Sequence, residues 1–334
     1  MISKPSGQTL LLAVVVAGSC VLVGYLLIFH DAGPPSANAA NTRSQLKLSQ
    51  IPFNGQRAYD YLNELCALGP RVSGSPAMQA QQKLLTEHFQ KLGAKVSTQA
   101  FQIRHPQNGK AVPMANLLVE WQPERRERIL LCAHYDTRPY PDQDPRNPRG
   151  TFLGANDGAS GTALLMELGQ QMSGIKGNLG VDFVFFDGEE FVFSDRDPYF
   201  LGSEYFAAGY VNARPPGPRY RCAVLLDMVG DADLQIYQER HGMTWDDTRP
   251  LVQEIWATAR RLGVREFIAT PKYDIRDDHL PLHNTAGIPS CDIIDFEYPA
   301  WHTQDDKPES CSALTLAKVG WVVEEWLKQA VRKR

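Results

Sequence analysis

The sequence has no excess of positive charge and lacks the signatures of several common enzyme classes. Its 34 Lys and Arg residues are outnumbered by 38 Asp and Glu residues, and both signs are interspersed along the chain. Without a basic stripe the chain offers little to neutralise phosphates, so nucleic-acid binding has no support. HExxH, GxSxG and Walker motifs are also missing, which removes the usual signatures of gluzincins, serine hydrolases and P-loop enzymes.

Cysteine is scarce, and its pattern does not suggest pairing. Beyond Cys20 in the first apolar run, the remaining cysteines are odd in number, stand singly in apolar stretches and form no CxxC motif. We therefore expect buried small hydrophobic side chains, with neither a disulfide framework nor thiolate metal ligands. These residues are Cys66, Cys132, Cys222, Cys291 and Cys311.

Residues 10–29 form a nearly unbroken apolar run without charge, long enough to cross a hydrocarbon core of about 30 Å. A cleaved signal peptide usually has a shorter apolar core, of about 7–15 residues, so the length favours an uncleaved anchor in a lipid bilayer. The alternative is cleavage near Ala37-Asn38-Ala39, which would make the protein secreted. Lys4 precedes the run, which places the rest of the chain on the extracytoplasmic side.

The sequence predicts three regions: an anchor or signal segment at 1–30, a linker at 31–49 rich in Pro, Ala, Asn and Ser, and one catalytic domain at 50–334. Within the domain, Ser75 and Pro76 mark a helix that ends at Gly93. Early adjacent strands give way to alternating strands and helices. This order predicts an α/β fold with a mixed, largely parallel sheet sandwiched between helices, and we expect a monomer. The predicted strands are 96–103, 115–121, 128–133, 181–186, 223–227 and 292–295, and the later helices are 162–172, 249–262 and 314–331.

Polar side chains follow the apolar strands at the points where those strands end. His134 follows one predicted strand, Glu189 and Glu190 follow another, and Asp227 ends a third. Because the carboxyl ends of parallel strands meet at one edge of a sheet, we expect these side chains to line a crevice there.

Two further candidate ligands lie in loops, Asp157 in the segment GANDG and His302 in the segment WHT. A lone carboxylate at a strand end is usually a helix cap or a turn former. Zinc, however, binds His nitrogen and carboxylate oxygen, and a catalytic site keeps one position open for water or substrate. The combination of ligand types after apolar strands therefore predicts a zinc site.

The order and context of these motifs resemble the zinc aminopeptidase superfamily and, within it, the glutaminyl-peptide cyclotransferases, over roughly residues 70–327. The cyclotransferase resemblance implies one zinc ion held by Asp157, Glu190 and His302, with Glu189 as the proton carrier. It also implies that Asp277 and Asp227 form a hydrogen-bond network with Glu189.

The two-zinc aminopeptidases of the same superfamily use a larger ligand set. Resemblance to them implies that His134 and Asp227 hold a second zinc ion, with Asp157 bridging the two metals. It further implies that Asp136 fixes the tautomer of His134.

Three features favour the cyclotransferases over the peptidases. Asp277-Asp278-His279 matches the loop that supplies Asp277 to the hydrogen-bond network with Glu189 and Asp227. Eleven residues, Phe191 to Leu201, separate Glu190 from Gly202-Ser203, where the peptidases have a shorter link. Trp301 directly precedes His302, and with Tyr298 it would wall a small pocket for a glutamine side chain. In contrast, Gly158-Ala159-Ser160-Gly161 after Asp157 is closer to the peptidase pattern, and Asp292 replaces a histidine of the animal cyclotransferases.

The expected reaction is the cyclisation of an N-terminal glutamine to pyroglutamate with release of ammonia. Zinc would polarise the γ-carbonyl, and Glu189 would carry the proton of the attacking amine to the leaving nitrogen. The alternatives are a di-zinc aminopeptidase that hydrolyses N-terminal residues, and a binding ectodomain that has kept the fold without the chemistry.

Overall fold

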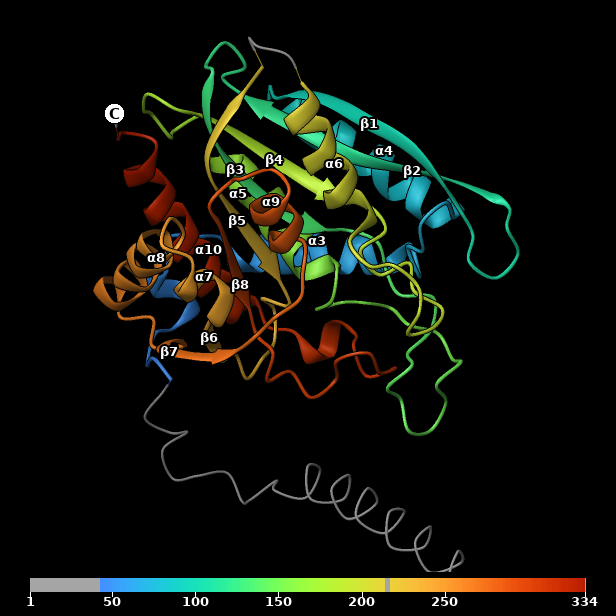
Figure 1. Cartoon of the computed structure of the whole chain (residues 1–334). Coiled ribbons are helices and arrows are strands. Elements are labelled where there is room, and N and C mark those ends of the chain that lie inside the picture. The colour runs from blue at the N-terminus through green and yellow to red at the C-terminus, as the bar shows by residue number, and fades with distance from the viewer. Residues whose placement is uncertain (1–42, 214–216, 334) are drawn as a thin grey trace, which may run out of the picture. The chain divides into compact units, whose positions relative to one another are not determined.

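A six-stranded mixed sheet with the strand order β1-β2-β4-β3-β5-β8 forms the centre of the molecule (Figure 1). The computed structural model describes residues 43–213 and 217–333. Strands β4, β3, β5 and β8 are parallel to one another, while β1 and β2 form an antiparallel hairpin that joins the sheet through β4. The predicted mixed, largely parallel sheet is therefore confirmed. The strands are β1 (Lys95–Arg104), β2 (Ala111–Trp121), β3 (Glu127–His134), β4 (Gly180–Phe186), β5 (Arg219–Asp227) and β8 (Ser290–Ile294).

The central strands are apolar on both faces because helices cover both faces. In β3, Ile129 and Leu131 belong to one hydrophobic core, while Leu130 and Cys132 belong to a second core on the opposite face. The larger core receives α3 (Gly55–Ala67), α4 (Pro76–Lys91), α5 (Ala159–Gln171), α8 (Arg249–Leu262) and α10 (Ala313–Ala330). The smaller core receives α6 (Leu201–Asn212) and α9 (His279–Asn284), which lie in front of the sheet in Figure 1.

Local signals placed several elements correctly. The hydroxyl of Ser75 accepts a hydrogen bond from the backbone N–H of Met78 at the start of α4, and Gly93 follows its end with a φ of +87°. Helix α8 has the predicted bounds. The sequence did not predict α3, α6, α7 (Arg240–Thr244), α9, or the small parallel sheet of β6 (Ile236–Glu239) and β7 (Phe267–Tyr273).

The predicted anchor, residues 1–30, and the first part of the predicted linker lie outside the described residues. Within the described ranges, no helix is long and apolar enough to span a membrane. The end of the predicted linker packs on the domain: Ser44 is buried, and its backbone N–H and its hydroxyl both donate to Oε1 of Glu266, each at 3.0 Å. Residues 44–49 of the predicted linker therefore belong to the same compact unit as the rest of the domain.

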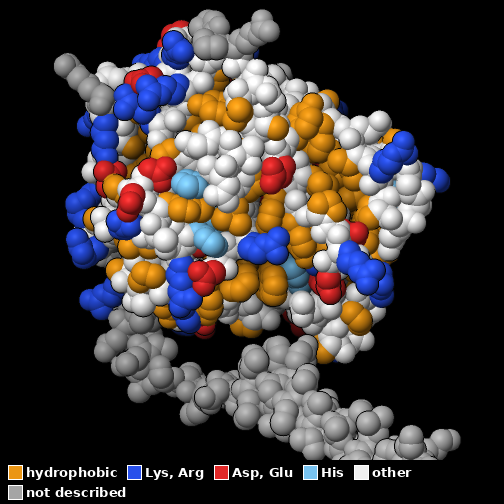
Figure 2. Space-filling view, in the orientation of Figure 1, with side chains coloured by type: hydrophobic (Ala, Val, Ile, Leu, Met, Phe, Trp, Pro, Cys, Tyr) orange, Lys and Arg blue, Asp and Glu red, His pale blue; other side chains and the backbone are white. Residues whose placement is uncertain are grey.

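The described cysteines are unpaired, and charged side chains of both signs lie on the face drawn in Figure 2. All five described cysteines are free, and all but the half-buried Cys222 are buried. On the face seen in Figure 2, hydrophobic side chains gather across the middle, and acidic and basic side chains are interspersed without a continuous basic stripe.

Candidate active site

The candidate ligands meet at the carboxyl edge of the parallel strands. Strand β3 lies between β4 on one side and β5 on the other, so the chain changes direction across the sheet at β3, which is where open α/β sheets form their binding crevice. His134 ends β3 and Asp227 ends β5, while Glu189 and Glu190 lie in the turn after β4. All four side chains are buried.

Two overlapping groups of side chains could hold a metal ion. The first group is Asp157, Glu190 and His302, and the second is His134, Asp157 and Asp227. In each group the ligand atoms lie within 4.8 Å of one another, and Asp157 belongs to both. The structure thus brings together all five residues that the sequence analysis offered as ligands.

The first group fits a bound cation. Nε2 of His302 lies 3.4 Å from Oε1 of Glu190 and 3.6 Å from Oδ2 of Asp157. Among the described residues, the Oδ2 atom of Asp157 is buried without a hydrogen-bond partner. An unpaired buried carboxylate oxygen is costly unless a cation or a donor compensates it, so this donor set matches the preference of zinc for His nitrogen and carboxylate oxygen.

The second group is held more tightly by its own contacts. Nε2 of His134 lies 3.1 Å from Oδ1 of Asp157 and 3.1 Å from Oδ1 of Asp227. Burial alone would lower the pKa of His134, but Asp227, Asp136 and Asp157 together raise it well above its usual value. The imidazole of His134 thus lies between two carboxylates that could share a metal ion with it.

The loop that carries Asp157 requires glycine at its turn. Gly158 has a φ of +96°, and a Cβ atom there would lie 2.6 Å from the backbone oxygen of Asp136. Asp306 accepts hydrogen bonds from the backbone N–H groups of Asn156 and Asp157, at 2.7 and 3.1 Å. These contacts fix the backbone on which the shared ligand stands.

Tyr298 does not line the catalytic pocket, which corrects the expectation from the sequence. It is buried behind the pocket wall, and its hydroxyl donates to Oδ1 of Asp306 at 2.9 Å. Through Asp306, Tyr298 supports the loop of Asp157. The expectation failed because a tyrosine hydroxyl can reach a buried partner that a phenylalanine would not need.

Asp136 makes its hydrogen bonds mainly to the turn after β4. It accepts the backbone N–H groups of Glu189 at 3.2 Å and of Glu190 at 3.1 Å. Its Oδ1 atom lies 3.7 Å from Nδ1 of His134, beyond the usual length of an N–H···O hydrogen bond. In this structure Asp136 therefore orients the two glutamates more directly than it orients the imidazole.

Arg138 and Asp142 belong to the site although the sequence analysis did not single them out. Arg138 donates to both carboxylate oxygens of Glu190, and it also donates to both carboxylate oxygens of Asp142. Oδ1 of Asp142 lies 3.2 Å from Nδ1 of His302. The signal that could have found Arg138 is its place four residues after His134, in the loop that leaves the end of β3.

The two adjacent glutamates have opposite electrostatic environments. Burial and the neighbouring Glu190 raise the pKa of Glu189 well above its usual value. Burial alone would also raise the pKa of Glu190, but His302 and Arg138 outweigh it and hold that pKa well below the usual value. Glu189 is thus suited to hold a proton, and Glu190 to remain an anion.

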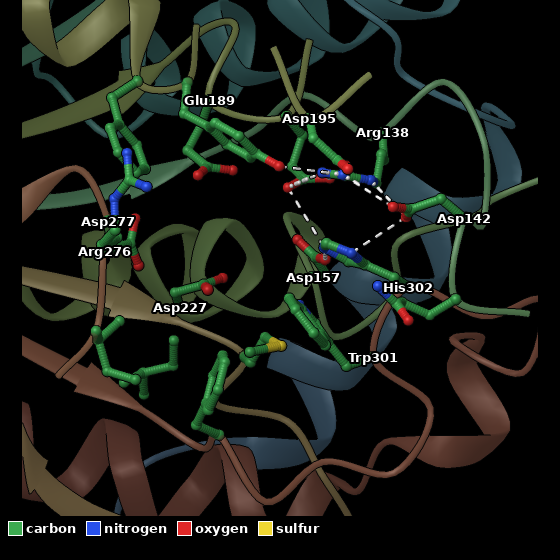
Figure 3. A pocket seen from close by; sticks show the side chains of 18 of the residues that line it. Arg138, Asp142, Asp157, Glu189, Asp195, Asp227, Arg276, Asp277, Trp301 and His302 are labelled. Carbon is green, nitrogen blue, oxygen red and sulfur yellow. Dashed lines mark hydrogen bonds and ion pairs between the residues drawn. The ribbon is translucent and has the colours of Figure 1, made fainter. Parts of the chain in front are cut away.

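A cavity of about 370 Å³ opens onto these side chains. Glu189, Asp227 and Asp277 face it from one side, and Trp301 and His302 face it from the other (Figure 3). The Trp301 ring lies 3.9 Å from the imidazole of His302, measured between ring centroids, so the predicted aromatic wall is present. Burial, followed by the charge of Asp227, raises the pKa of Asp277 well above its usual value.

Backbone strain is concentrated around this cavity. Among the described residues, four that are not glycine have a positive φ, and three of them, Phe200, Met228 and His302, line the cavity. Strained backbone of this kind persists where the surrounding structure holds it, which is common at functional sites.

Two further histidines of the described domain, His279 and His283, lie outside both metal groups. His279 is buried, with Nε2 3.6 Å from Glu239 and Nδ1 3.7 Å from Asp292. His283 stacks on Trp245 at 3.6 Å and lies 3.2 Å from Asp247. Both histidines therefore have structural partners of their own.

The chain was compared with known protein families and with curated proteins. Residues 116–327 match peptidase family M28. A glutaminyl-peptide cyclotransferase from Bos taurus is 25% identical over 288 residues, with 76% of each chain covered.

Solved structures match more closely. A glutaminyl cyclase from Fimbriiglobus ruber is 40% identical, with a TM-score of 0.80, and the match covers 87% of this chain and 98% of that one. A structure described as a leucine aminopeptidase precursor from Bacteroides thetaiotaomicron is 31% identical, with a TM-score of 0.77, and the match covers 83% and 98% of the two chains.

Proposed function

The chain belongs to peptidase family M28, and we propose that within this family it is a glutaminyl-peptide cyclotransferase. It converts the N-terminal glutamine of peptides or proteins to pyroglutamate and releases ammonia. The observation that carries this assignment is one cavity that places a buried acidic cluster around Glu189 opposite a wall formed by Trp301 and His302.

Asp157, Glu190 and His302 are the residues that would hold a single zinc ion. The chemistry that zinc supplies at such a site is polarisation of a carbonyl oxygen. Arg138 keeps Glu190 ionised, and Asp142 faces the imidazole nitrogen of His302 that points away from the ligand group. Together these contacts hold the ligands in place before the substrate arrives.

Glu189 is the proton carrier of the reaction. The α-amine of the substrate attacks the γ-amide carbon of the same glutamine, so a carbon–nitrogen bond forms and the bond to the side-chain nitrogen breaks. Glu189 takes the proton lost by the amine and gives it to the departing nitrogen, which leaves as ammonia. Asp227 and Asp277 line the same cavity. After burial and Glu190, the charge of Asp277 also raises the pKa of Glu189.

Both reacting groups belong to one glutamine residue, so the rate of ring closure depends mainly on how they are oriented. A cavity that accepts the glutamine side chain holds the amine and the carbonyl close together. Trp301 forms one wall of this space, and the buried carboxylates form the other.

A second candidate function rests on the second ligand group. His134 and Asp227 flank Asp157 as a second metal would require, and the leucine aminopeptidase precursor has a similar structure. In that case Glu189 would activate water for hydrolysis of an N-terminal residue, and the protein would hold two zinc ions.

The deciding experiment uses the zinc-loaded protein without its N-terminal apolar segment and two peptides, one beginning with Gln and one beginning with Leu. Mass spectrometry should show loss of ammonia from the Gln peptide and no cleavage of either. Release of free leucine, with ammonia loss no faster than the spontaneous rate, would instead identify an aminopeptidase.

We also propose that residues 10–29 anchor the protein in a lipid bilayer with the catalytic domain on the extracytoplasmic side, and that the domain works as a monomer. The length and the apolar character of the run support the anchor. Fractionation of the full chain, followed by protease treatment of intact cells, tests this placement: recovery of the protein in the soluble fraction, or protection from protease, would contradict it.

A further inference from the structure

A second cavity, of about 250 Å³, adjoins the catalytic one. Arg138, Asp142 and Asp195 line both cavities, so the second begins where the first ends. Arg138 is held in place by Glu190 and Asp142. A chain that leaves the catalytic cavity on this side therefore meets the second cavity next.

The wall of the second cavity is aromatic and is built before any ligand arrives. Phe193 lies edge-on to Tyr140, with ring centroids 6.2 Å apart and planes at 80°. The same ring packs against Phe191 at 5.0 Å and His105 at 4.5 Å. These neighbours restrict the Phe193 ring, which lowers the entropic cost of using it for recognition.

Arg149 adds a cationic side to this wall. Its guanidinium lies 4.8 Å from the centroid of the Tyr140 ring. Asp142 and Asp195 oppose the charges of Arg138 and Arg149 around the cavity, so the cavity has no large excess of either sign. The half-buried rings of Phe193 and Tyr140 offer an apolar surface, and the Arg149 guanidinium beside them can pack on the face of an incoming aromatic ring.

Part of the wall of the second cavity comes from the segment that follows Glu190. Val192, Phe193, Ser194 and Asp195 come from the eleven-residue link, 191–201, that follows Glu190. Tyr199, from the same link, lines the catalytic cavity and is not among the residues that line the second one. One segment thus contributes to both cavities.

We propose that the second cavity is a subsite for an aromatic side chain of the substrate, at the second or third residue after the N-terminus. The proposal rests on the proposed cyclotransferase function. Successive side chains of an extended peptide point to opposite sides, and each residue advances the chain by about 3.3–3.6 Å, so one of these two positions enters the cavity and the other does not.

The test measures kcat/KM for four substrates: glutaminamide, Gln-Ala-Ala-Ala, Gln-Phe-Ala-Ala and Gln-Ala-Phe-Ala. We expect one of the two Phe peptides to be turned over about tenfold better than the all-alanine peptide. The substitution Phe193→Ala should remove most of this preference. Arg149→Gln, at an exposed position, should do so as well. The matched control is Tyr205→Ala, which removes an exposed ring stacked on Phe101 in a different part of the domain and should keep the preference.

Glutaminamide distinguishes loss of the subsite from loss of catalysis because it has no residue to occupy the second cavity. Its turnover by Phe193→Ala at a rate close to that of the unchanged protein shows that the variant is folded and that the catalytic cavity is intact. Equal rates for the three peptides, or a preference that survives both substitutions, would overturn the subsite. Failure of every substrate to release ammonia would overturn the proposed function itself.

Discussion

Arg138 donates from one nitrogen, Nη1, to both carboxylate oxygens of Glu190, at 2.9 and 3.0 Å. The rest of its guanidinium holds Asp142, whose carboxylate faces His302. One buried cation therefore connects two of the three side chains that would bind the zinc ion. It supplies the positive charge that these ligands need when no metal is bound.

Replacing Arg138 with methionine should make folding more dependent on zinc. The variant leaves Glu190 buried without its cation, which we expect to lower the stability of the metal-free protein by about 3 kcal/mol. Added zinc restores a positive charge, so the rise in Tm on zinc addition should be larger than in the unchanged protein. Arg146→Met, at an exposed ion pair with Asp305, is the control. An equal zinc-induced rise in Arg138→Met and in the unchanged protein would contradict the prediction.

Glu189→Gln tests the proton carrier. The amide keeps the size of the side chain but cannot take the proton of the amine, so kcat should fall by about 10²-fold or more. Zinc content, measured by elemental analysis, should not change because Glu189 is not among the proposed ligands. The exposed Glu204→Gln serves as the control. Turnover within a few-fold of the unchanged protein would remove Glu189 from this role.

Metal removal and metal counting separate the two candidate functions. Chelation should abolish ammonia release, and added zinc should restore it. Native mass spectrometry should find one zinc ion per chain, both in the unchanged protein and in His134→Asn, and none in Asp157→Ala. Two zinc ions in the unchanged protein and one in His134→Asn would favour the aminopeptidase.

Tyr298→Phe tests the support of the loop of Asp157. The substitution removes the hydrogen bond to Asp306, which holds the backbone of Asn156 and Asp157. We expect stability to fall by about 1 kcal/mol and zinc affinity to fall by about tenfold. Calorimetric titration with zinc measures the affinity. If Tyr298 lined the substrate pocket instead, KM would change while the zinc affinity stayed constant.

The raised pKa of Asp295 predicts how the free energy of unfolding depends on pH. Burial raises the pKa of this carboxyl group to about 7, although the backbone N–H groups of Gln235 and Glu297 oppose the rise. The folded protein then keeps a proton that the unfolded chain loses near pH 4, so the free energy of unfolding falls as pH rises from about 4 to 7. Asp295→Asn lacks this carboxyl group. Its free energy of unfolding should therefore fall less over the same pH interval, by an amount on the order of a few kcal/mol.

Urea unfolding at a series of pH values measures this difference, with Asp60→Asn, at an exposed carboxylate, as the control. Parallel curves for Asp295→Asn and the unchanged protein would show that Asp295 ionises normally in the folded state.

Much of the architecture could be predicted because it depends on local signals. The Ser75 cap, the apolar face of α8 and the continuous apolar strand β3 each depend on residues close together in the sequence. Helix α6 was missed because it is apolar around much of its circumference and has no clear periodic face. The strands β6 and β7 are short and irregularly paired, which leaves little pattern to detect.

The candidate site was partly predictable for the same reason. His134, Glu190 and Asp227 follow apolar strands, and a parallel sheet brings such positions together whatever its detailed packing. Arg138 was missed because an arginine in a loop usually lies at the surface, whereas here it is 4% exposed and surrounded by carboxylates. Tyr298 was placed in the pocket because its partner, Asp306, is revealed only by the folded loop.

The sequence by itself determined which chemical groups are available and that they lie at strand ends, because strand periodicity and ligand chemistry are properties of short segments. Tertiary structure decided which atoms meet. The strand order β4-β3-β5 brought together side chains that are up to 93 residues apart, as His134 and Asp227 are. Packing set the distances among Asp157, Glu190 and His302. These distances depend on many weak contacts across the whole domain, so no local pattern in the chain contains them.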